Sequence, residues 1–305
     1  MRWVVTGAAG FIGSHLAEAL LARGDEVVGV DCFTDYYDPA LKEENARGRD
    51  VRRLDLADEA LDLDGVDGVF HLAGQPGVRS FGDVFPVYLR RNVLATQRVF
   101  QSAAEAGVRV VFASSSSVYG EAERYPTPED VQPRPISPYG VTKLACEHLA
   151  AAYARSFGLD AVSLRYFTVY GPRQRPDMFF RRICDALATG GSIELYGSGE
   201  QSRSFTEVAD VVRATVAAMD GGEAGAVYNV GGGDEASLVE AIALLERVSG
   251  RPLDLRRIDP AKGDVKRTKA DVARIGAALG WEPRVGLEDG LARMWAWASA
   301  RVAPL

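Results

Sequence analysis

The sequence is poor in the residues that build metal sites and disulfide frameworks. It contains three cysteines and three histidines, and neither set clusters with carboxylates at a metal-ligand spacing. The cysteines are odd in number and far apart, so they indicate no disulfide framework. We therefore expect no bound metal and a protein of the reducing cytoplasm.

Long apolar runs and an excess of basic residues are also lacking. No apolar run approaches the ~20 residues that span a membrane, and residues 2–6 form a strand-like segment where a signal peptide would otherwise begin. The formal net charge of −7 and the pI near 5.2 argue against a general nucleic-acid or membrane-surface binder. With 305 residues, 47% of them hydrophobic, the chain is long enough for one large or two modest domains.

What the N-terminal region does contain is a glycine-rich turn between two regular segments. The run TGAAGFIG places Gly7, Gly10 and Gly13 between the strand at 2–6 and an apolar-periodic helix expected at 14–22. Such a turn lets the backbone approach a pyrophosphate, and the helix N-terminus supplies N–H groups and a favourable dipole. The pattern predicts a dinucleotide site, with an ordinary glycine turn as the alternative.

The next two strands carry residues that predict the type of dinucleotide. A strand at 26–30 ends in Asp31. A carboxylate there accepts hydrogen bonds from the adenosine ribose and repels a 2′-phosphate, which favours NAD over NADP. The alternative is a turn aspartate at a strand end. A third strand at 51–54 leads into Asp55 and Leu56, which we expect to flank the adenine.

Strands and helices continue to alternate as far as residue 166, which predicts an α/β fold with a Rossmann-type doubly wound parallel sheet. We expect strands at 66–72, 108–113 and 161–166, and helices at 83–106 and 138–157. Small residues, Ala73 and Gly74, follow the first of these strands where a cofactor would press on the backbone. The serine run SSSSVYG follows the second strand, at the sheet edge where such folds place their chemistry, although it also fits a hydroxyl-rich turn.

Tyr139 and Lys143 lie one helical turn apart at the start of the helix expected at 138–157. Ser137 is a favourable N-cap and Pro138 suits the first helical position, so both side chains share one face. A phenol is a poor base at neutral pH, but a neighbouring ammonium favours the phenolate. The spacing is weak evidence by itself, because ordinary helix surfaces produce it often.

Beyond about residue 168 the alternation loosens. We expect helices at 177–189, 206–219, 237–249, 271–279 and 287–302, strands at 193–196, 227–230 and 253–258, and polar loops at 171–176 and 197–203. The prediction is an NAD-binding domain of residues 1–167 with about 205–230, and a smaller C-terminal α/β lobe of residues 168–204 and 231–305. The substrate would bind in the cleft between them.

Taken in order, the glycine turn, Asp31, the HLAG run at 71–74, the serine run and SPYGVTK closely resemble the extended short-chain dehydrogenase/reductases, in particular the NAD-dependent nucleotide-sugar epimerase/dehydratase family. The resemblance covers essentially the whole chain. It implies that Tyr139 is the catalytic base, that Lys143 binds the nicotinamide ribose and activates the tyrosine, and that Ser115 hydrogen-bonds the reacting oxygen. The implied NAD-binding residues are Gly7, Gly10, Phe11, Ile12, Gly13, Asp31, Asp55, Leu56, Leu72, Ala73, Gly74, Asn92, Tyr139 and Lys143.

The residues Ser115-Ser116-Ser117 bear on which reaction of this family to expect. Sugar-nucleotide 4,6-dehydratases carry Thr-Asp-Glu here, and without the two carboxyl groups the elimination of water lacks its proton carriers. Nucleotide-uronate decarboxylases usually have a glutamate where Ser117 stands, which weakens that alternative too. Epimerases tolerate small hydroxyl or apolar residues at these positions.

The segment RYFTVYGPRQRPDM at 165–178 is most similar to UDP-glucuronate 4-epimerases. A substrate carboxylate needs donors, which Ser116, Ser117, Thr168 and Arg175 would supply. Arg175 also fits a surface loop or a contact with the diphosphate.

Two later segments resemble the family's substrate-binding motifs. QSRSF at 201–205 is similar to Q-x-R-D-F, which implies that Gln201 and Arg203 bind substrate. AKGD at 261–264 is similar to R-x-G-D, but alanine replaces a diphosphate-binding arginine. Either Lys262 or Arg267 compensates, or the affinity for the diphosphate is lower.

The resemblance implies NAD-dependent 4-epimerisation of a UDP-sugar, best UDP-glucuronate to UDP-galacturonate, through a transient 4-keto intermediate. UDP-glucuronate decarboxylase and UDP-glucose or UDP-GlcNAc 4-epimerase stay open as alternatives. A non-catalytic NAD-binding scaffold is a remote one, because the tyrosine and the lysine are both present. Apolar residues on more than one face of the helices at 83–106 and 138–157 fit the homodimer typical of the family, and burial within one subunit explains them almost as well.

Overall fold

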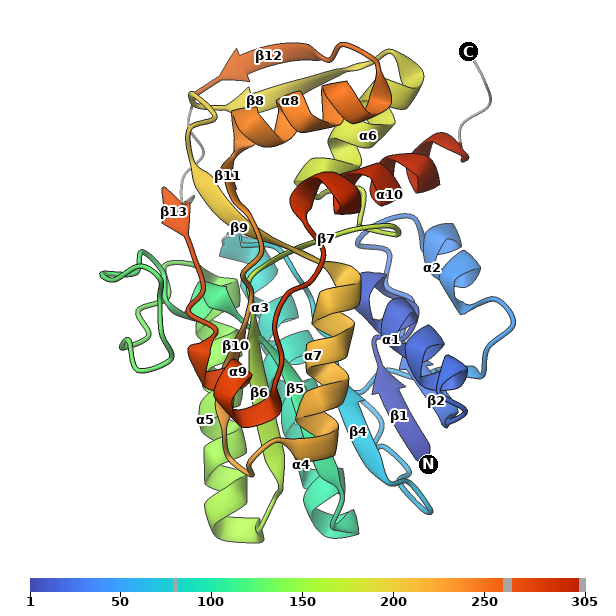
Figure 1. The fold of residues 1–305 in the computed structure, drawn as a ribbon. Coiled ribbons are helices and arrows are strands. Elements are labelled where there is room, and N and C mark those ends of the chain that lie inside the picture. The colour runs from blue at the N-terminus through green and yellow to red at the C-terminus, as the bar shows by residue number, and fades with distance from the viewer. Residues whose placement is uncertain (79–81, 260–264, 302–305) are drawn as a thin grey trace.

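A central sheet of parallel strands organises the structure, a computed structural model that describes residues 1–78, 82–259 and 265–301 (Figure 1). Its seven strands lie in the order β10 (Val227–Val230), β6 (Ala161–Tyr166), β5 (Arg109–Ser115), β4 (Gly68–His71), β1 (Arg2–Thr6), β2 (Glu26–Asp31) and β3 (Val51–Arg53). Every neighbouring pair is parallel. The predicted doubly wound sheet is confirmed. The direction in which strands are added reverses between β1 and β4, and open α/β sheets bind ligands beyond the strand carboxyl ends at such a point.

Helices bury both faces of this sheet (Figure 1). One face is covered by α1 (Phe11–Ala22) and α7 (Val208–Gly221), and the other by α4 (Ala95–Ala106) and α5 (Pro138–Phe157). Because side chains alternate along a strand, Val5 of β1 joins the first core while Val4 joins the second. Burial on both sides explains why the strands read as almost continuous apolar runs.

A smaller α/β lobe lies beyond the carboxyl ends of the central strands, at the top of Figure 1. Its main elements are α6 (Phe179–Thr189), β8 (Ser192–Tyr196), α8 (Leu238–Ser249), β12 (Asp254–Ile258) and α10 (Leu287–Ser299). Residues of α6, α8 and α10 form a core separate from the two cores of the central sheet. A capping box between Ser237 and Glu240 begins α8, where a helix was expected at 237–249.

The link between the sheet and the lobe differs from the sequence prediction. The structure has a strand, β9 (Ser202–Glu207), where we expected the end of a polar loop and the start of a helix, and α7 begins only at Val208. β9 belongs to a four-stranded sheet with β7 (Thr168–Tyr170), β11 (Glu235–Ser237) and β13 (Arg267–Thr268). Its residues are largely polar and its partners are distant in sequence, so no apolar alternation marks it.

The helix predicted at 83–106 is also not a single α-helix. A 3₁₀ turn (Gly82–Val84) and α3 (Phe85–Tyr88) precede a π-helical segment, η2 (Leu89–Leu94), which continues into α4. The widened turn places the buried Asn92 where its side chain reaches a neighbouring loop and its carbonyl accepts from Cys146 Sγ at 3.4 Å. Helical periodicity in the sequence does not distinguish a π segment from α-helix.

The remaining differences are small. α1 begins at Phe11 with Gly10 as N-cap, three residues before the expected start. Residues 33–49, expected to form a surface loop with a short helix, contain that helix as α2 (Pro39–Ala46), which Asp38 caps. α9 (Ala273–Leu279) packs against β10 and α7. Within the described ranges, no helix is both long enough and apolar enough to cross a membrane.

Candidate active site

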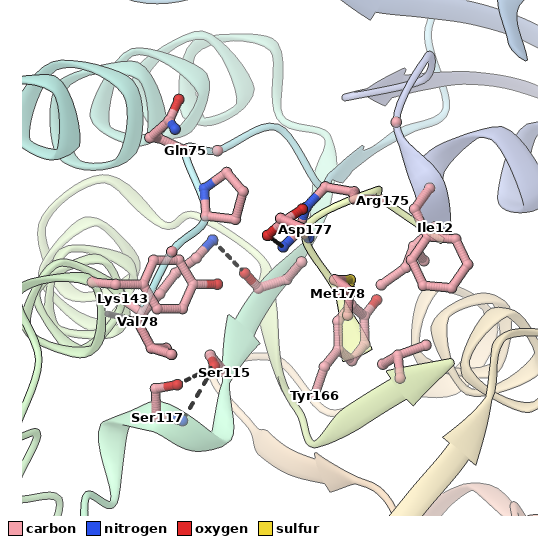
Figure 2. Close-up of a pocket in the computed structure, with 18 of the residues that line it drawn as sticks. Ile12, Gln75, Val78, Ser115, Ser117, Lys143, Tyr166, Arg175, Asp177 and Met178 are labelled. Carbon is pink, nitrogen blue, oxygen red and sulfur yellow. Dashed lines mark hydrogen bonds and ion pairs between the residues drawn. The ribbon is translucent and has the colours of Figure 1, made fainter. Parts of the chain in front are cut away.

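A cavity of about 720 Å³ lies where the central strands end and the lobe begins (Figure 2). It collects nearly all of the residues predicted for the site, although they come from segments up to two hundred positions apart. The predicted residues that line it are Gly7, Gly10, Phe11, Ile12, Gly13, Asp31, Asp55, Leu56, Leu72, Ala73, Gly74, Ser115, Ser116, Ser117, Tyr139, Lys143, Thr168, Arg175, Gln201 and Arg203. Among the residues predicted to bind NAD, Asn92 alone does not line it.

The glycine turn is shaped for close backbone packing. Gly7 has a φ of +71°, and a Cβ there would lie 2.9 Å from the amide nitrogen of Ala73. A Cβ on Gly13 would lie 2.1 Å from the carbonyl oxygen of Gly7. Gly10, the N-cap of α1, offers no side chain to satisfy the first N–H groups of the helix. This end of the cavity therefore fits the pyrophosphate of a dinucleotide.

Asp31 lies almost buried at the end of β2. Its carboxylate accepts backbone hydrogen bonds from Phe33 at 2.8 Å and Ala9 at 3.2 Å, while burial raises the pKa of the carboxyl group. Lys42, which the sequence reasoning missed, lines the cavity in the same region and donates to Thr34 Oγ1 at 2.8 Å. Lys42 lies in α2, within a polar part of the sequence where no periodic pattern marks it. Burial lowers the pKa of this lysine.

Asn92 supports the cavity wall from behind. Its amide oxygen accepts from the backbone nitrogen of Gln75 at 2.7 Å, and its amide nitrogen donates to Thr142 Oγ1 at 3.1 Å. It thereby connects the segment after β4 to α5. A Cβ on Gly74 would lie 3.1 Å from the Asn92 oxygen and 3.4 Å from Lys143 Nζ, which accounts for glycine at that position.

The start of α5 brings Tyr139 and Lys143 to the cavity as predicted. Ser137 caps the helix by accepting from the Gly140 backbone nitrogen at 3.1 Å. Lys143 is 4% exposed, its Nζ donates to the carbonyl of Ala113 at 2.8 Å, and it lies 5.9 Å from the centre of the Tyr139 ring. A Cβ on Gly140 would lie 2.5 Å from the carbonyl oxygen of Ser117, so α5 packs directly against the serine run.

The serine run presents its members to different surroundings. Ser115 Oγ accepts from the backbone nitrogen of Ser117 and donates to Ser117 Oγ, both at 3.1 Å, on the cavity side (Figure 2). Ser114 points away and donates to Glu147, which forms a buried ion pair with Arg165. Strand alternation separates the two roles, and the sequence did not reveal the Glu147–Arg165 pair.

The lobe side of the cavity is rich in hydrogen-bond donors. Arg175 forms two 3.0 Å contacts with Asp177, whose carboxylate also accepts from Tyr36 Oη at 3.4 Å (Figure 2). Arg203 is nearly buried, and its guanidinium donates to the backbone carbonyl of Val265 at 2.6 Å. These contacts hold both arginines at the cavity.

Of the two residues that could compensate for the missing arginine of the R-x-G-D turn, the structure describes only Arg267, and it does not reach the cavity. Arg267 is bound to Glu235 by contacts of 2.6 and 2.9 Å and does not line the cavity. Its hydrogen bond lowers the pKa of Glu235 to about 2. Lys262 and the rest of AKGD lie outside the described residues. Among the residues that the structure describes, no group of histidines, cysteines or carboxylates could hold a metal ion.

Several known proteins are similar to this chain along almost its whole length. A Bacillus subtilis protein described as an uncharacterized UDP-glucose epimerase is 40% identical over 98% of this chain and 98% of its own. The UDP-glucuronic acid 4-epimerase of Bacillus cereus, solved with UDP-glucuronic acid and NAD, superimposes with a TM-score of 0.94 at 39% identity, covering 98% and 99% of the two chains. The protein MoeE5, solved with UDP-glucuronic acid and NAD, is 43% identical with a TM-score of 0.88 and coverage of 99% and 100%.

The family model also matches. The model described as "NAD dependent epimerase/dehydratase family" matches residues 3–231. These residues include the glycine turn, the serine run and the tyrosine–lysine pair. On the cavity's geometry and these similarities, the chain belongs to the NAD dependent epimerase/dehydratase family.

Proposed function

We propose that this protein is an NAD-dependent 4-epimerase that interconverts UDP-glucuronate and UDP-galacturonate. The observation that carries the proposal is that Tyr139, Lys143 and Ser115 share one cavity with the glycine turn. Several relatives are named for such a reaction, including the UDP-glucuronate 4-epimerase of Thermodesulfobacterium geofontis, which is 35% identical over 98% of this chain and 97% of its own.

The residues present fit NAD. Gly7, Gly10 and Gly13 would receive the pyrophosphate, and Asp31 the adenosine ribose, whose 2′-phosphate its carboxylate would repel. When bound, NAD would accept the hydride of C4 and return it to the opposite face of the sugar. Because the cofactor ends each cycle in its starting state, tight binding costs the enzyme no turnover.

Tyr139 would move the proton. In the first half-reaction its phenolate accepts the proton of the C4 hydroxyl, and in the second it returns that proton to the same oxygen. Lys143, held by the carbonyl of Ala113, places its ammonium 5.9 Å from the centre of the Tyr139 ring, where it would bind the nicotinamide ribose. Ser115, whose Oγ already accepts from the backbone nitrogen of Ser117, would hydrogen-bond the C4 oxygen of the sugar and position it.

The choice of a uronate as the substrate rests on the groups expected to surround C6 of the sugar. Ser116, Ser117, Thr168 and Arg175 all line the cavity and can donate to a carboxylate. A 4-keto uronate is a β-keto acid that readily loses CO₂, so an epimerase must hold the carboxylate in an orientation that disfavours cleavage. The four donors offer such a hold. Gln201 and Arg203 line the same cavity, where Arg203 would neutralise the diphosphate and Gln201 would donate a hydrogen bond to it.

UDP-glucose is the second candidate substrate. MoeE5 has been solved with UDP-glucose as well as with UDP-glucuronic acid, and a Mycolicibacterium smegmatis relative at 37% identity is a UDP-glucose 4-epimerase. Because Arg175 is paired with Asp177, it favours an acidic sugar less than an unpaired arginine would. Decarboxylation and dehydration are weaker candidates, because no carboxyl group occupies positions 116 and 117.

We also propose that the enzyme is a cytoplasmic homodimer with an NAD-binding domain of residues 1–167 and about 205–230 and a substrate lobe made of the remainder. Its three cysteines are all free thiols. Exposed apolar side chains gather on α3, η2 and α5, where a second subunit would cover them: Phe85, Val87, Leu89, Leu94 and Val141.

The test is to incubate the purified enzyme with UDP-glucuronate, and in parallel with UDP-glucose, and to identify the product by NMR. UDP-galacturonate formed from the acid alone supports the proposal. A pentose product would make the protein a decarboxylase, and UDP-galactose formed in preference would make it a hexose epimerase. Turnover of neither substrate would refute the proposed reaction while leaving the family assignment intact.

A further inference from the structure

Three consecutive residues of the loop at 171–176, Arg173, Gln174 and Arg175, make contacts in three different directions. Arg173 reaches α1, whose first turn lines the cofactor side of the cavity. Gln174 is buried, and it donates to the Val169 carbonyl and accepts from the Arg181 backbone nitrogen at the start of α6, both at 3.0 Å. Arg175 enters the cavity. The loop therefore joins the cofactor helix, the lobe and the substrate side.

The contacts of Arg173 are the most extensive of the three. Its Nη1 donates to Glu18 Oε1 at 2.8 Å, and its Nη2 contacts both Glu18 Oε2 and, at 2.6 Å, His15 Nδ1. His15 in turn contacts the carbonyl of Pro172 through Nε2 at 2.8 Å. A carbonyl only accepts, so the contact with Pro172 places the proton of His15 on Nε2, which then cannot also accept from Arg173 Nε 3.2 Å away. His15 Nδ1 then accepts from Arg173 Nη2. Burial and the neighbouring guanidinium lower the pKa of His15 to about 4, which keeps the ring neutral.

The backbone of Arg173 has an unfavourable conformation, which the side-chain contacts with His15 and Glu18 stabilise. Its φ is 63°, in the left-handed region that few residues other than glycine adopt, and the described residues contain only one other non-glycine case, Phe33. A strained backbone persists only where its surroundings overdetermine it. The side-chain contacts to His15 and Glu18 provide that determination.

We propose that Arg173 is a positioning residue, which anchors the loop to α1 through His15 and Glu18 and thereby holds Arg175 at the substrate. The inference rests on the proposed function, in which Arg175 binds the sugar carboxylate. It adds that the residue expected to contact the substrate is held in place by α1, the helix whose first turn would bind the cofactor. Arg173 itself lies outside the cavity and touches no reacting group.

The test is a double-mutant cycle on the NAD-loaded enzyme with UDP-glucuronate, measuring Kd by calorimetry together with KM and kcat. Arg173→Asn removes the guanidinium but keeps a residue that tolerates the left-handed conformation. We expect it to raise Kd and KM about tenfold with kcat changed less than about twofold, and to leave the NAD content unchanged. In an Arg175→Ala background the same substitution should change Kd less than about twofold, because its effect acts through Arg175.

Two further variants sharpen the result. Glu18→Gln keeps the shape of the anchor without its charge and should shift Kd in the same direction by less. Arg23→Asn is the control: it removes an arginine that joins the far end of α1 to Asp25 and Asp220, away from the cavity, and should leave Kd unchanged.

Each outcome has one meaning. If the wild type binds and converts UDP-glucuronate but Arg173→Asn does not weaken binding, or weakens it equally in both backgrounds, the positioning role is wrong and the proposed function stands. If the wild type does not bind the uronate at all, both the proposed substrate and this inference fail.

Discussion

The buried ion pair behind the serine run gives a prediction whose size follows from the structure. Arg165 contacts Glu147 at 3.0 and 2.7 Å, and the two side chains are only 6% and 7% exposed. Arg165 also donates to Tyr119 Oη at 2.8 Å, and Ser114 donates to Glu147. Replacing Glu147 alone would leave a guanidinium buried without a countercharge.

We expect Glu147→Leu to lower the free energy of unfolding by about 3–5 kcal/mol, the usual cost of removing one partner of a buried pair. That is a large share of the ~5–15 kcal/mol that stabilises a typical protein. The double variant Glu147→Leu with Arg165→Met should lose less than the single variant, because no charge is then left buried. The kcat of the single variant should also fall, since Glu147 lies one turn after Lys143 and its partner Ser114 precedes Ser115.

The assay is urea denaturation of the NAD-loaded proteins at pH 7, followed by fluorescence and circular dichroism, with the midpoint compared at constant slope. The matched control is Arg109→Leu, which breaks a partly exposed pair with Asp160 at the amino ends of the central strands. This substitution should cost about 1 kcal/mol or less. A loss below about 1 kcal/mol for Glu147→Leu, or a double variant as damaged as the sum of its single variants, would refute the reasoning.

Four more expectations can be checked in the same preparations. Gly13→Ala should abolish co-purification of NAD, measured by the absorbance of released cofactor, because its Cβ would lie 2.1 Å from the Gly7 carbonyl oxygen; a variant with full NAD content would contradict the assigned cradle. Tyr139→Phe should reduce kcat by at least about 10²-fold with NAD still bound, and substantial residual turnover would count against the tyrosine as base. Asp31→Asn should raise binding of NADP relative to NAD about tenfold in fluorescence titrations, since a 2′-phosphate would no longer meet a carboxylate, and an unchanged ratio would mean that Asp31 does not set the preference. Because the pKa of His15 is depressed from 6.5 to about 4, its contribution to stability is complete above pH 6.5 and is lost as the pH falls towards 4. The midpoint of urea unfolding should therefore decline less over that range in His15→Gln than in the wild type. An equal decline in the two proteins would show that His15 is not neutral in the fold.

Much of the cofactor side could be predicted from the sequence because its signals are local. The glycine turn, Asp31 and the Tyr139–Lys143 pair each sit at a strand end or helix start that neighbouring residues specify. Parallel topology then brings those ends to one edge, so the cavity contains them together. Strand alternation and capping chemistry act over a few residues, which is the range that a sequence pattern can report.

The elements that the sequence did not predict depend on contacts between distant segments. β9 is a polar strand recognised only through partners from β7, β11 and β13, and the π segment at Asn92 forms where α5 and the Gln75 loop meet it. Neither has a local pattern of its own. The predicted domain boundaries and the role of each site residue stay predictions for the experiments above.

The sequence by itself determined the sheet, the family and the residue types at the cavity, because each depends on short-range periodicity or on motifs that keep their order along the chain. Only the tertiary structure decided which charges face each other. Nothing in the spacing of residues 15, 18 and 173, or of 147 and 165, indicates that they meet. Those pairings arise where packed elements cross, and they determine how firmly the predicted residues are held.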